Sequence, residues 1–245
     1  MLENTKIINP LEPQDDRPLL EIPLPDGSNE QVSIIVIHHE RPEYLNICLQ
    51  SIHCMSNLSN YEIIVVDNAS KDDQTKPYLD AIEEEGVKVI RNKTNLYWSA
   101  AANKGVSVAD KNSKYLIFLH CDTVILNQAW IDLLINVSIA HDSGMVGTEM
   151  GHYLIQKRKS GFIQEWCMLM TRECWDDVGP WPEELPIIGN AFIMTLRAQM
   201  KGYKPQAMTN PLVHHYKAFS FDTPEEYNLA SENSMTVIPR LMQKA

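Results

Sequence analysis

A histidine and an aspartate one residue apart, His120 and Asp122, end the strongly apolar run YLIFL at residues 115–119. On an extended segment alternate side chains project to the same face, so both can reach one ion while Cys121 points away. An imidazole with a carboxylate suits Mn²⁺ or another borderline divalent ion better than Mg²⁺, which prefers oxygen ligands. An ordinary hydrogen-bonded histidine at a strand end is the alternative. The pair predicts a metal site that needs further ligands.

A second pair of histidines, His214 and His215, follows the apolar segment PLV near the end of the sequence. If this segment is a strand, alternation turns only one of the two rings towards a given face. We expect one histidine of the pair to join His120 and Asp122 at the metal, provided that the two segments meet in the fold. The sequence does not say which of the two it is.

Other polar residues follow apolar runs elsewhere. Asp67 directly follows YEIIVV, and its carboxylate can accept the ring N–H of uracil or thymine. Capping of the next helix would account for a serine at position 70, but it would give the Asp67 carboxylate no role. Asn95 and Asn103 flank a small-residue helical segment, where Asn103 either contacts a ligand or has a purely structural role. These residues are candidate ligand contacts.

A loop bounded by prolines, GPWPEELP, carries Trp181, Glu183 and Glu184. One interpretation is a solvated acidic turn. The other is an acceptor-recognition loop in which Trp181 stacks on a sugar or another flat apolar face.

Short apolar runs alternate with helical segments in the first half of the sequence and must position these residues. The runs are VSIIVI, YEIIVV, VKVI and YLIFL, which begin at residues 32, 61, 87 and 115. This alternation predicts an α/β fold with a mostly parallel sheet covered by helices. Ligands of such sheets bind beyond the carboxyl ends of the strands, which is where the candidate residues fall.

The chain divides into three parts by composition. Residues 1–30 form a Pro-rich N-terminal arm, 31–217 one domain, and 218–245 a polar C-terminal tail with one helix. Within the domain, 31–125 form the nucleotide-binding half and 126–217 a less regular acceptor half. The acceptor half is predicted to hold a smaller mixed sheet and a helix that Gly202 closes.

Composition narrows the class of protein. The net charge is −11 and the basic residues are scattered, which argues against nucleic-acid binding. The five cysteines are odd in number and lack a CxxC pair, which indicates reduced thiols and a cytoplasmic protein. No apolar run approaches the ~20 residues of a membrane span. Peripheral membrane association and the oligomeric state stay open. The first strand lacks a Gly-rich turn, which argues against a dehydrogenase or a nucleotidyltransferase.

In order and spacing, several segments resemble those of the family 2 glycosyltransferases, which have a GT-A fold. The segments are VSIIVIHHERPEYLNICLQSI, YEIIVVDNASKDD, NLYWSAAANKGV, YLIFLHCDTVI, WCMLMTRECWDDVGPW, LRAQMKGYK and VHHY. YLIFLHCDTVI resembles the strand with the DxD metal motif, in a variant form. Tyr97 stands where the family usually has glycine. The resemblance spans residues 32–216.

The resemblance implies roles for single residues. It implies that a metal at His120, Asp122 and one of His214 and His215 neutralises charge on the departing nucleoside diphosphate. The residues implied or expected to bind the nucleotide or donor sugar are His38, Glu40, Asp67, Asn95, Asn103 and Cys121. The expected acceptor-side residues are Trp181 and Asn190.

The resemblance fails at the acidic pair that precedes the family's LR…GY helix, because Asn190 and Ala191 stand there. The usual general base of the inverting reaction is therefore missing. Glu183 and Glu184 are the replacements that we expect, with Glu149, Glu165 or a retaining mechanism as alternatives.

The sequence thus predicts a metal-dependent glycosyltransferase that uses a nucleoside diphosphate sugar, with UDP preferred over dTDP. We expect the acceptor to be a glycan or another hydroxyl compound, in bacterial polysaccharide or glycan assembly. The alternative is a catalytically silent GT-A domain that binds a sugar nucleotide or a partner protein.

Overall fold

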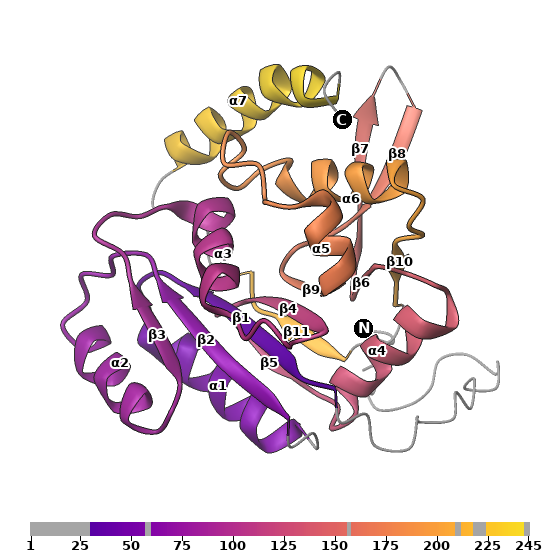
Figure 1. The fold of residues 1–245 in the computed structure, drawn as a ribbon. Coiled ribbons are helices and arrows are strands. Elements are labelled where there is room, and N and C mark those ends of the chain that lie inside the picture. The colour runs from indigo at the N-terminus through magenta and orange to yellow at the C-terminus, as the bar shows by residue number, and fades with distance from the viewer. Residues whose placement is uncertain (1–29, 57–59, 156–157, 209–211, 218–223, 243–245) are drawn as a thin grey trace, which may run out of the picture.

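A computed structural model describes residues 30–56, 60–155, 158–208, 212–217 and 224–242 (Figure 1). Residues 1–29 of the expected N-terminal arm lie outside the described residues.

The centre of the molecule is a seven-stranded sheet in the order β10-β6-β9-β4-β1-β2-β3. The predicted runs form its parallel part, which comprises β1 (Val32–His38), β2 (Tyr61–Asp67), β3 (Lys88–Arg91) and β4 (Tyr115–His120). These strands are rich in Val and Ile, whose branched side chains fit a sheet packed on both faces. The remaining strands are β6 (Met145–Gly147), β9 (Cys167–Thr171) and β10 (Gln206–Ala207), of which β9 runs antiparallel to β4 and β6.

Helices cover both faces of this sheet. One face packs against α1 (Pro42–Met55), α2 (Thr75–Glu84) and α4 (Trp130–Ala140). The other packs against α3 (Tyr97–Val108), α5 (Arg172–Val178) and α6 (Asn190–Met200). Helix α3 lies very close to β1, since a Cβ added at Gly105 would clash with Ile35 Cγ2. The mostly parallel sheet flanked by helices confirms the predicted fold class.

Two small antiparallel sheets complete the fold. Strand β5 (Thr123–Ile125) pairs with β11 (Val213–His215), and β7 (Met150–Ile155) pairs with β8 (Arg158–Ile163). The β5–β11 pair brings the far end of the domain to the residues that follow β4.

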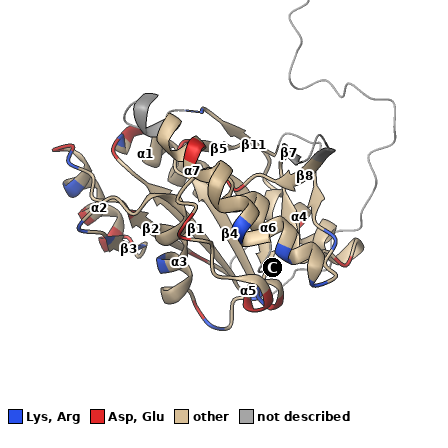
Figure 2. Cartoon of the chain, turned by 90° about the horizontal axis from the view of Figure 1, so that it is seen from above, with Lys and Arg blue, Asp and Glu red and all other residues tan. Residues whose placement is uncertain are grey.

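The C-terminal tail contains the helix that the sequence predicts, α7 (Pro224–Met242), which packs on α6 through Ile238 and its neighbours. No helix among the described residues combines the length and apolarity of a membrane span. Charged residues are spread over many elements, and the visible Lys and Arg residues do not gather on one of them (Figure 2).

Candidate functional site

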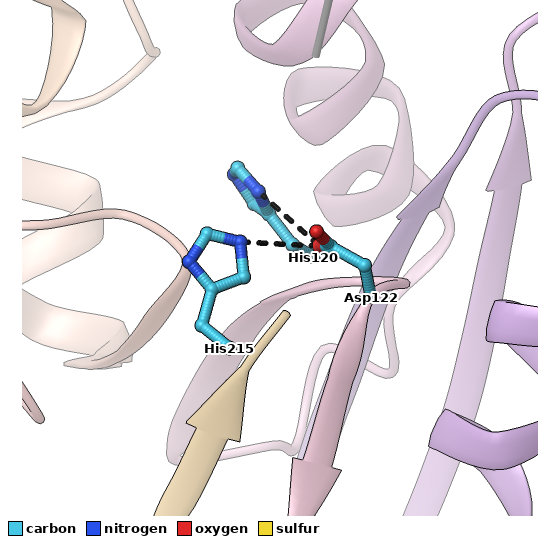
Figure 3. Close-up of side chains that lie close together, drawn as sticks. All are labelled: His120, Asp122 and His215. Atoms are coloured by element: carbon cyan, nitrogen blue, oxygen red, sulfur yellow. Dashed lines mark hydrogen bonds and ion pairs between the residues drawn. The ribbon is translucent and has the colours of Figure 1, made fainter. Parts of the chain in front are cut away.

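His120, Asp122 and His215 form a compact cluster at the carboxyl edge of the sheet (Figure 3). Asp122 Oδ1 lies 3.1 Å from His215 Nε2 and 3.8 Å from His120 Nδ1. One potential ligand atom of each residue lies within 4.8 Å of the others, close enough for a shared ion. Two imidazole nitrogens and one carboxylate oxygen are a ligand set that fits Mn²⁺ or a similar divalent ion.

Strand pairing decides which histidine of the second pair reaches this cluster. His215 pairs with Thr123 across β5 and β11, and Asp122 O accepts a hydrogen bond from Tyr216 N at 2.9 Å. His214 is exposed, and its ring contacts the ring of Tyr216, with centroids 5.0 Å apart. Of the two, His215 therefore turns towards His120 and Asp122, and His214 is corrected to a surface residue.

Each histidine of the cluster packs against a tryptophan ring. His120 packs against Trp98 with centroids 4.5 Å apart, and His215 stacks on Trp166 at 4.9 Å. The pKa of His120 is lowered to about 4, chiefly by burial and also by the nearby His215, while the Asp122 carboxylate opposes the shift. His120 is therefore neutral near pH 7, as a metal ligand must be.

A cavity of about 80 Å³ adjoins the cluster, and its lining includes His38, Tyr44, Asn95, Trp98 and His120. Ligand sites usually measure ~300–1,000 Å³, so only part of a nucleotide sugar fits inside it in this conformation. Sequence reasoning missed Tyr44 and Trp98, although each stands in a segment that it had singled out. The ring nitrogens His38 Nε2, Trp98 Nε1 and His120 Nε2 are buried without a hydrogen-bond partner among the described residues.

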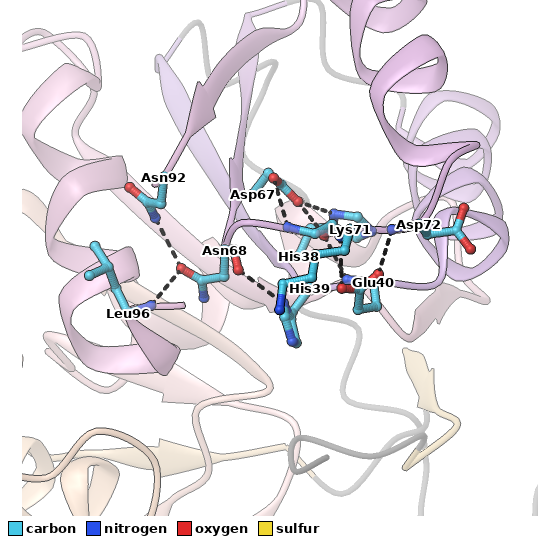
Figure 4. A network of polar contacts seen from close by, with 10 residues as sticks. His38, His39, Glu40, Asp67, Asn68, Lys71, Asp72, Asn92 and Leu96 are labelled. Carbon is cyan, nitrogen blue, oxygen red and sulfur yellow. Dashed lines mark hydrogen bonds and ion pairs between the residues drawn. The ribbon is translucent and has the colours of Figure 1, made fainter. Parts of the chain in front are cut away.

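Asp67 and His38 form a buried pair at the ends of β2 and β1 (Figure 4). Asp67 Oδ1 accepts hydrogen bonds from His38 Nδ1 at 2.9 Å and Ser70 Oγ at 2.5 Å, and Oδ2 accepts one from Ser70 N at 3.3 Å. Burial by itself raises the pKa of Asp67, but the bonds from His38 and Ser70 outweigh it and lower the pKa overall. An ionised Asp67 can only accept from His38 Nδ1, so Nδ1 carries a proton, and in the neutral ring Nε2 is then an acceptor.

Neighbouring polar residues hold the loops around this pair. The Glu40 carboxylate accepts hydrogen bonds from the backbone N–H groups of Lys71 and Asp72, at 2.8 and 2.9 Å (Figure 4). Asn68 donates to Tyr97 O at 3.0 Å, and Asn95 Oδ1 accepts from Tyr97 N at 2.8 Å. Glu40 thus fixes the turn after β1, while Asn95 both shapes the start of α3 and lines the cavity.

The structure corrects three predictions for ligand contacts. The Asn103 side chain bonds the backbone N and O of Trp181 and the Glu183 carboxylate, so it fastens α3 to the following loop. Trp181 has no exposed surface and packs against Trp98 and Phe118, which excludes stacking on a sugar. Asn190 is equally buried and donates to Ser99 Oγ at 3.2 Å. Tertiary packing uses these polar and aromatic groups internally.

The candidate acids are dispersed. Glu183 and Glu184 are exposed and line a separate open groove of about 860 Å³, which shares no lining residue with the cavity. The structure therefore does not bring them to the metal cluster. Glu149 accepts a hydrogen bond from Trp166 Nε1, and burial raises the pKa of Glu165 to about 7.

Cys121 lines the cavity, and its backbone N–H donates to Ile37 O at 3.2 Å. Burial raises the pKa of its thiol, so it acts as a small neutral wall residue.

Comparisons with known proteins give the family and the fold of the chain. A model of the family described as glycosyl transferase family 2 matches residues 33–179. The O-antigen biosynthesis protein RfbC of Myxococcus xanthus is 21% identical over 232 residues, which cover 79% of this chain and 18% of RfbC. The uncharacterized protein y4gI of Sinorhizobium fredii (strain NBRC 101917 / NGR234) is 23% identical over 235 residues, which cover 80% of this chain and 26% of y4gI. The chain therefore spans a small part of these curated relatives.

Among solved structures, the mannosyltransferase PcManGT from Pyrobaculum calidifontis, in complex with GDP-Man and Mn²⁺, has a similar fold. The TM-score is 0.61 at 14% sequence identity, over 75% of this chain and 56% of that one. At this identity the likeness concerns the fold.

Proposed function

We propose that this chain, which belongs to glycosyl transferase family 2, transfers a sugar from a nucleoside diphosphate donor to an acceptor hydroxyl with the help of a divalent metal. The observation that carries the proposal is the cluster of His120, Asp122 and His215 beside a cavity whose lining includes ring nitrogens without a hydrogen-bond partner in the described part of the chain. Such a site offers metal ligands and hydrogen-bonding groups at one edge of the sheet, as a nucleotide sugar requires.

His120, Asp122 and His215 would hold the metal, and Mn²⁺ suits their nitrogen-rich ligand set better than Mg²⁺. The bound metal would neutralise charge on the diphosphate leaving group. Asp122 contributes the negative charge of the cluster, and the His120 ring contributes a neutral nitrogen because burial keeps it unprotonated. PcManGT was solved with Mn²⁺, which supports this choice of metal by analogy.

Asp67 and His38 would recognise the base of the donor. Asp67 Oδ2 can accept a further hydrogen bond, and in the neutral ring so can His38 Nε2, which has no partner among the residues that the structure describes. An acceptor pairs with a ring N–H, which uracil, thymine and guanine carry at the position where cytosine and adenine have a bare nitrogen. UDP remains our first choice of nucleotide and dTDP the second, and the GDP-Man of PcManGT adds GDP to the set worth testing.

We place this reaction in the assembly of a bacterial polysaccharide, supported by the name of the relative RfbC. The second candidate function is a silent domain that binds a sugar nucleotide without transferring the sugar. It is favoured by the burial of Asn190 where the family has its acid, and by the separate groove that holds Glu183 and Glu184.

The test is release of nucleoside diphosphate from UDP-, dTDP- and GDP-sugars in the presence of Mn²⁺, with and without glycan acceptors. We expect release that Asp122→Ala abolishes. Metal-dependent binding of the donor without release under any condition would favour the silent domain. Donor binding that neither Mn²⁺ nor Asp122→Ala affects would refute the metal site.

A further inference from the structure

Trp166 contacts both histidines of the metal cluster with different parts of the residue. Its backbone oxygen accepts a hydrogen bond from His120 N at 3.0 Å, which fixes the end of β4. Its indole lies almost parallel to the His215 ring, with centroids 4.9 Å apart and an interplanar angle of 15°. One residue from the acceptor half of the domain therefore supports two ligands that come from segments far apart in the sequence.

The indole is itself held in place. Its Nε1–H donates to Glu149 Oε2 at 3.0 Å, and Glu149 O accepts a hydrogen bond from Gln164 N at 3.1 Å. Trp166 is 7% exposed and belongs to the same buried cluster as Val213, two residues before His215. A chain of contacts thus runs from Glu149 through Trp166 and His215 to Asp122.

His215 depends on this support more than the other ligands do. It ends a strand of three residues, whereas His120 ends a strand of six. The His215 ring can bind a metal only when Nε2 points at Asp122, as it does at 3.1 Å. Stacking on a fixed indole restricts rotation of the ring about its side-chain torsions, so less conformational entropy is lost when a metal binds.

We propose that Trp166, oriented by Glu149, is a positioning residue that holds His215 in the geometry for metal binding. This inference rests on the proposed metal site. It makes Trp166 a determinant of metal affinity in addition to being part of the core. The alternative is that Trp166 is only a core residue that lies beside His215. In that case, substitution of Trp166 would lower the stability of the protein without a specific loss of metal affinity.

The experiment measures binding of Mn²⁺ alone to the full chain, by the electron paramagnetic resonance signal of free Mn²⁺. We expect Trp166→Leu to weaken binding by about 10-fold or more, the range found for groups that orient metal ligands. Glu149→Gln retains an oxygen acceptor for the indole N–H and should stay within about twofold of the wild type, while Glu149→Leu should weaken binding. Trp175→Leu is the matched control, because Trp175 is similarly buried and packs on Phe118.

The outcomes separate this inference from the proposed function. If the wild type and Asp122→Ala bind Mn²⁺ equally, the metal site itself is wrong. If Asp122→Ala loses binding but Trp166→Leu does not, only the role of Trp166 is refuted. If circular dichroism shows that Trp166→Leu does not fold, the Mn²⁺ affinities of Trp166→Phe and Glu149→Leu decide whether Trp166 positions His215. Phe keeps a ring to stack but loses the N–H, so both variants should bind Mn²⁺ more weakly, and wild-type affinity in both overturns the proposal.

Discussion

Replacing Asp67 with asparagine should weaken the preference of the donor site for bases that carry a ring N–H. In the native chain the carboxylate accepts the proton of His38 Nδ1, which leaves His38 Nε2 as an acceptor. An asparagine can turn its NH₂ group towards Nδ1, and His38 then carries its proton on Nε2 and becomes a donor. The change converts an acceptor surface into one that can also donate.

The size of the effect follows from the burial of the pair. His38 is fully buried and Asp67 is 4% exposed, so an acceptor placed opposite another acceptor there finds no water to satisfy it. A buried unsatisfied polar group costs about 1–3 kcal/mol, which is roughly 5- to 150-fold in affinity. We therefore expect the wild type to bind UDP at least about fivefold more tightly than CDP. In Asp67→Asn most of this ratio should disappear, because the penalty against cytosine is lost.

Isothermal titration calorimetry of UDP, CDP, GDP and ADP in the presence of Mn²⁺ provides the measurement. Asp80→Asn is the control, since the Asp80 carboxylate lies on exposed α2, where Lys76 pairs with it at 2.6 Å. It should leave all four affinities unchanged. Equal binding of UDP and CDP by the wild type would refute the reasoning, and so would a UDP/CDP ratio that Asp67→Asn does not alter.

Three further predictions follow from packing and burial. Gly105→Ala should lower the melting temperature by about 2–8 °C in a thermal scan, because its Cβ would clash with Ile35 Cγ2. An unchanged melting temperature would mean that α3 packs less closely on β1 than described. Of the five thiols, only the exposed Cys54 should react at once with a disulfide reagent, because burial raises the pKa of the other four. Rapid reaction of several thiols in the native protein would contradict this prediction. Glu183→Gln and Glu184→Gln should release nucleoside diphosphate at a rate within about twofold of the wild type, because both residues line the separate groove. A loss of tenfold or more would indicate that these carboxylates take part in the reaction.

The sheet and its ligand-binding edge were predictable because they depend on short-range patterns. Runs such as VSIIVI specify buried parallel strands, and the chain direction then places Asp67 and His120 at one edge. The sequence predicted the pairing of His120 with Asp122 from alternation on an extended segment, but β4 ends at His120, and Cys121 and Asp122 form a turn before β5. The turn brings the two side chains together, and Cys121, which was expected to point away, lines the same cavity. In contrast, alternation shows that His214 and His215 face opposite ways without showing which faces inwards. That choice is made by the register between β11 and β5, a long-range contact that the sequence does not display.

The acceptor side was predicted poorly for a physical reason. Trp181 and Glu183 stand in a proline-bounded loop that looks like exposed recognition surface. Two hydrogen bonds between the Asn103 side chain and the Trp181 backbone, one donated by each residue, nevertheless hold the loop on α3. Asn190 is likewise drawn inwards by Ser99. Each contact joins residues about eighty or ninety positions apart, as the separations of 78 and 91 show, and local periodicity carries no information about such pairs.

In the proposed metal site, His120 stands where the resemblance places the first acid of the metal motif. This replacement changes the charge of the site, and the charge affects how metal and donor bind. His120 is kept neutral by burial, so the cluster offers Mn²⁺ a single carboxylate, that of Asp122. The occupied cluster then carries a net positive charge of one when His215 is also neutral, whereas two carboxylates would leave it uncharged. A metal that keeps an excess positive charge attracts a diphosphate more strongly, especially in a chain whose own net charge is −11. Because coupling between two ligands is reciprocal, the nucleotide strengthens metal binding by the same factor. In the proposed metal site, one carboxylate in place of two would therefore lower the affinity for the metal alone and raise the dependence of metal and donor on each other, which is compatible with a working transferase.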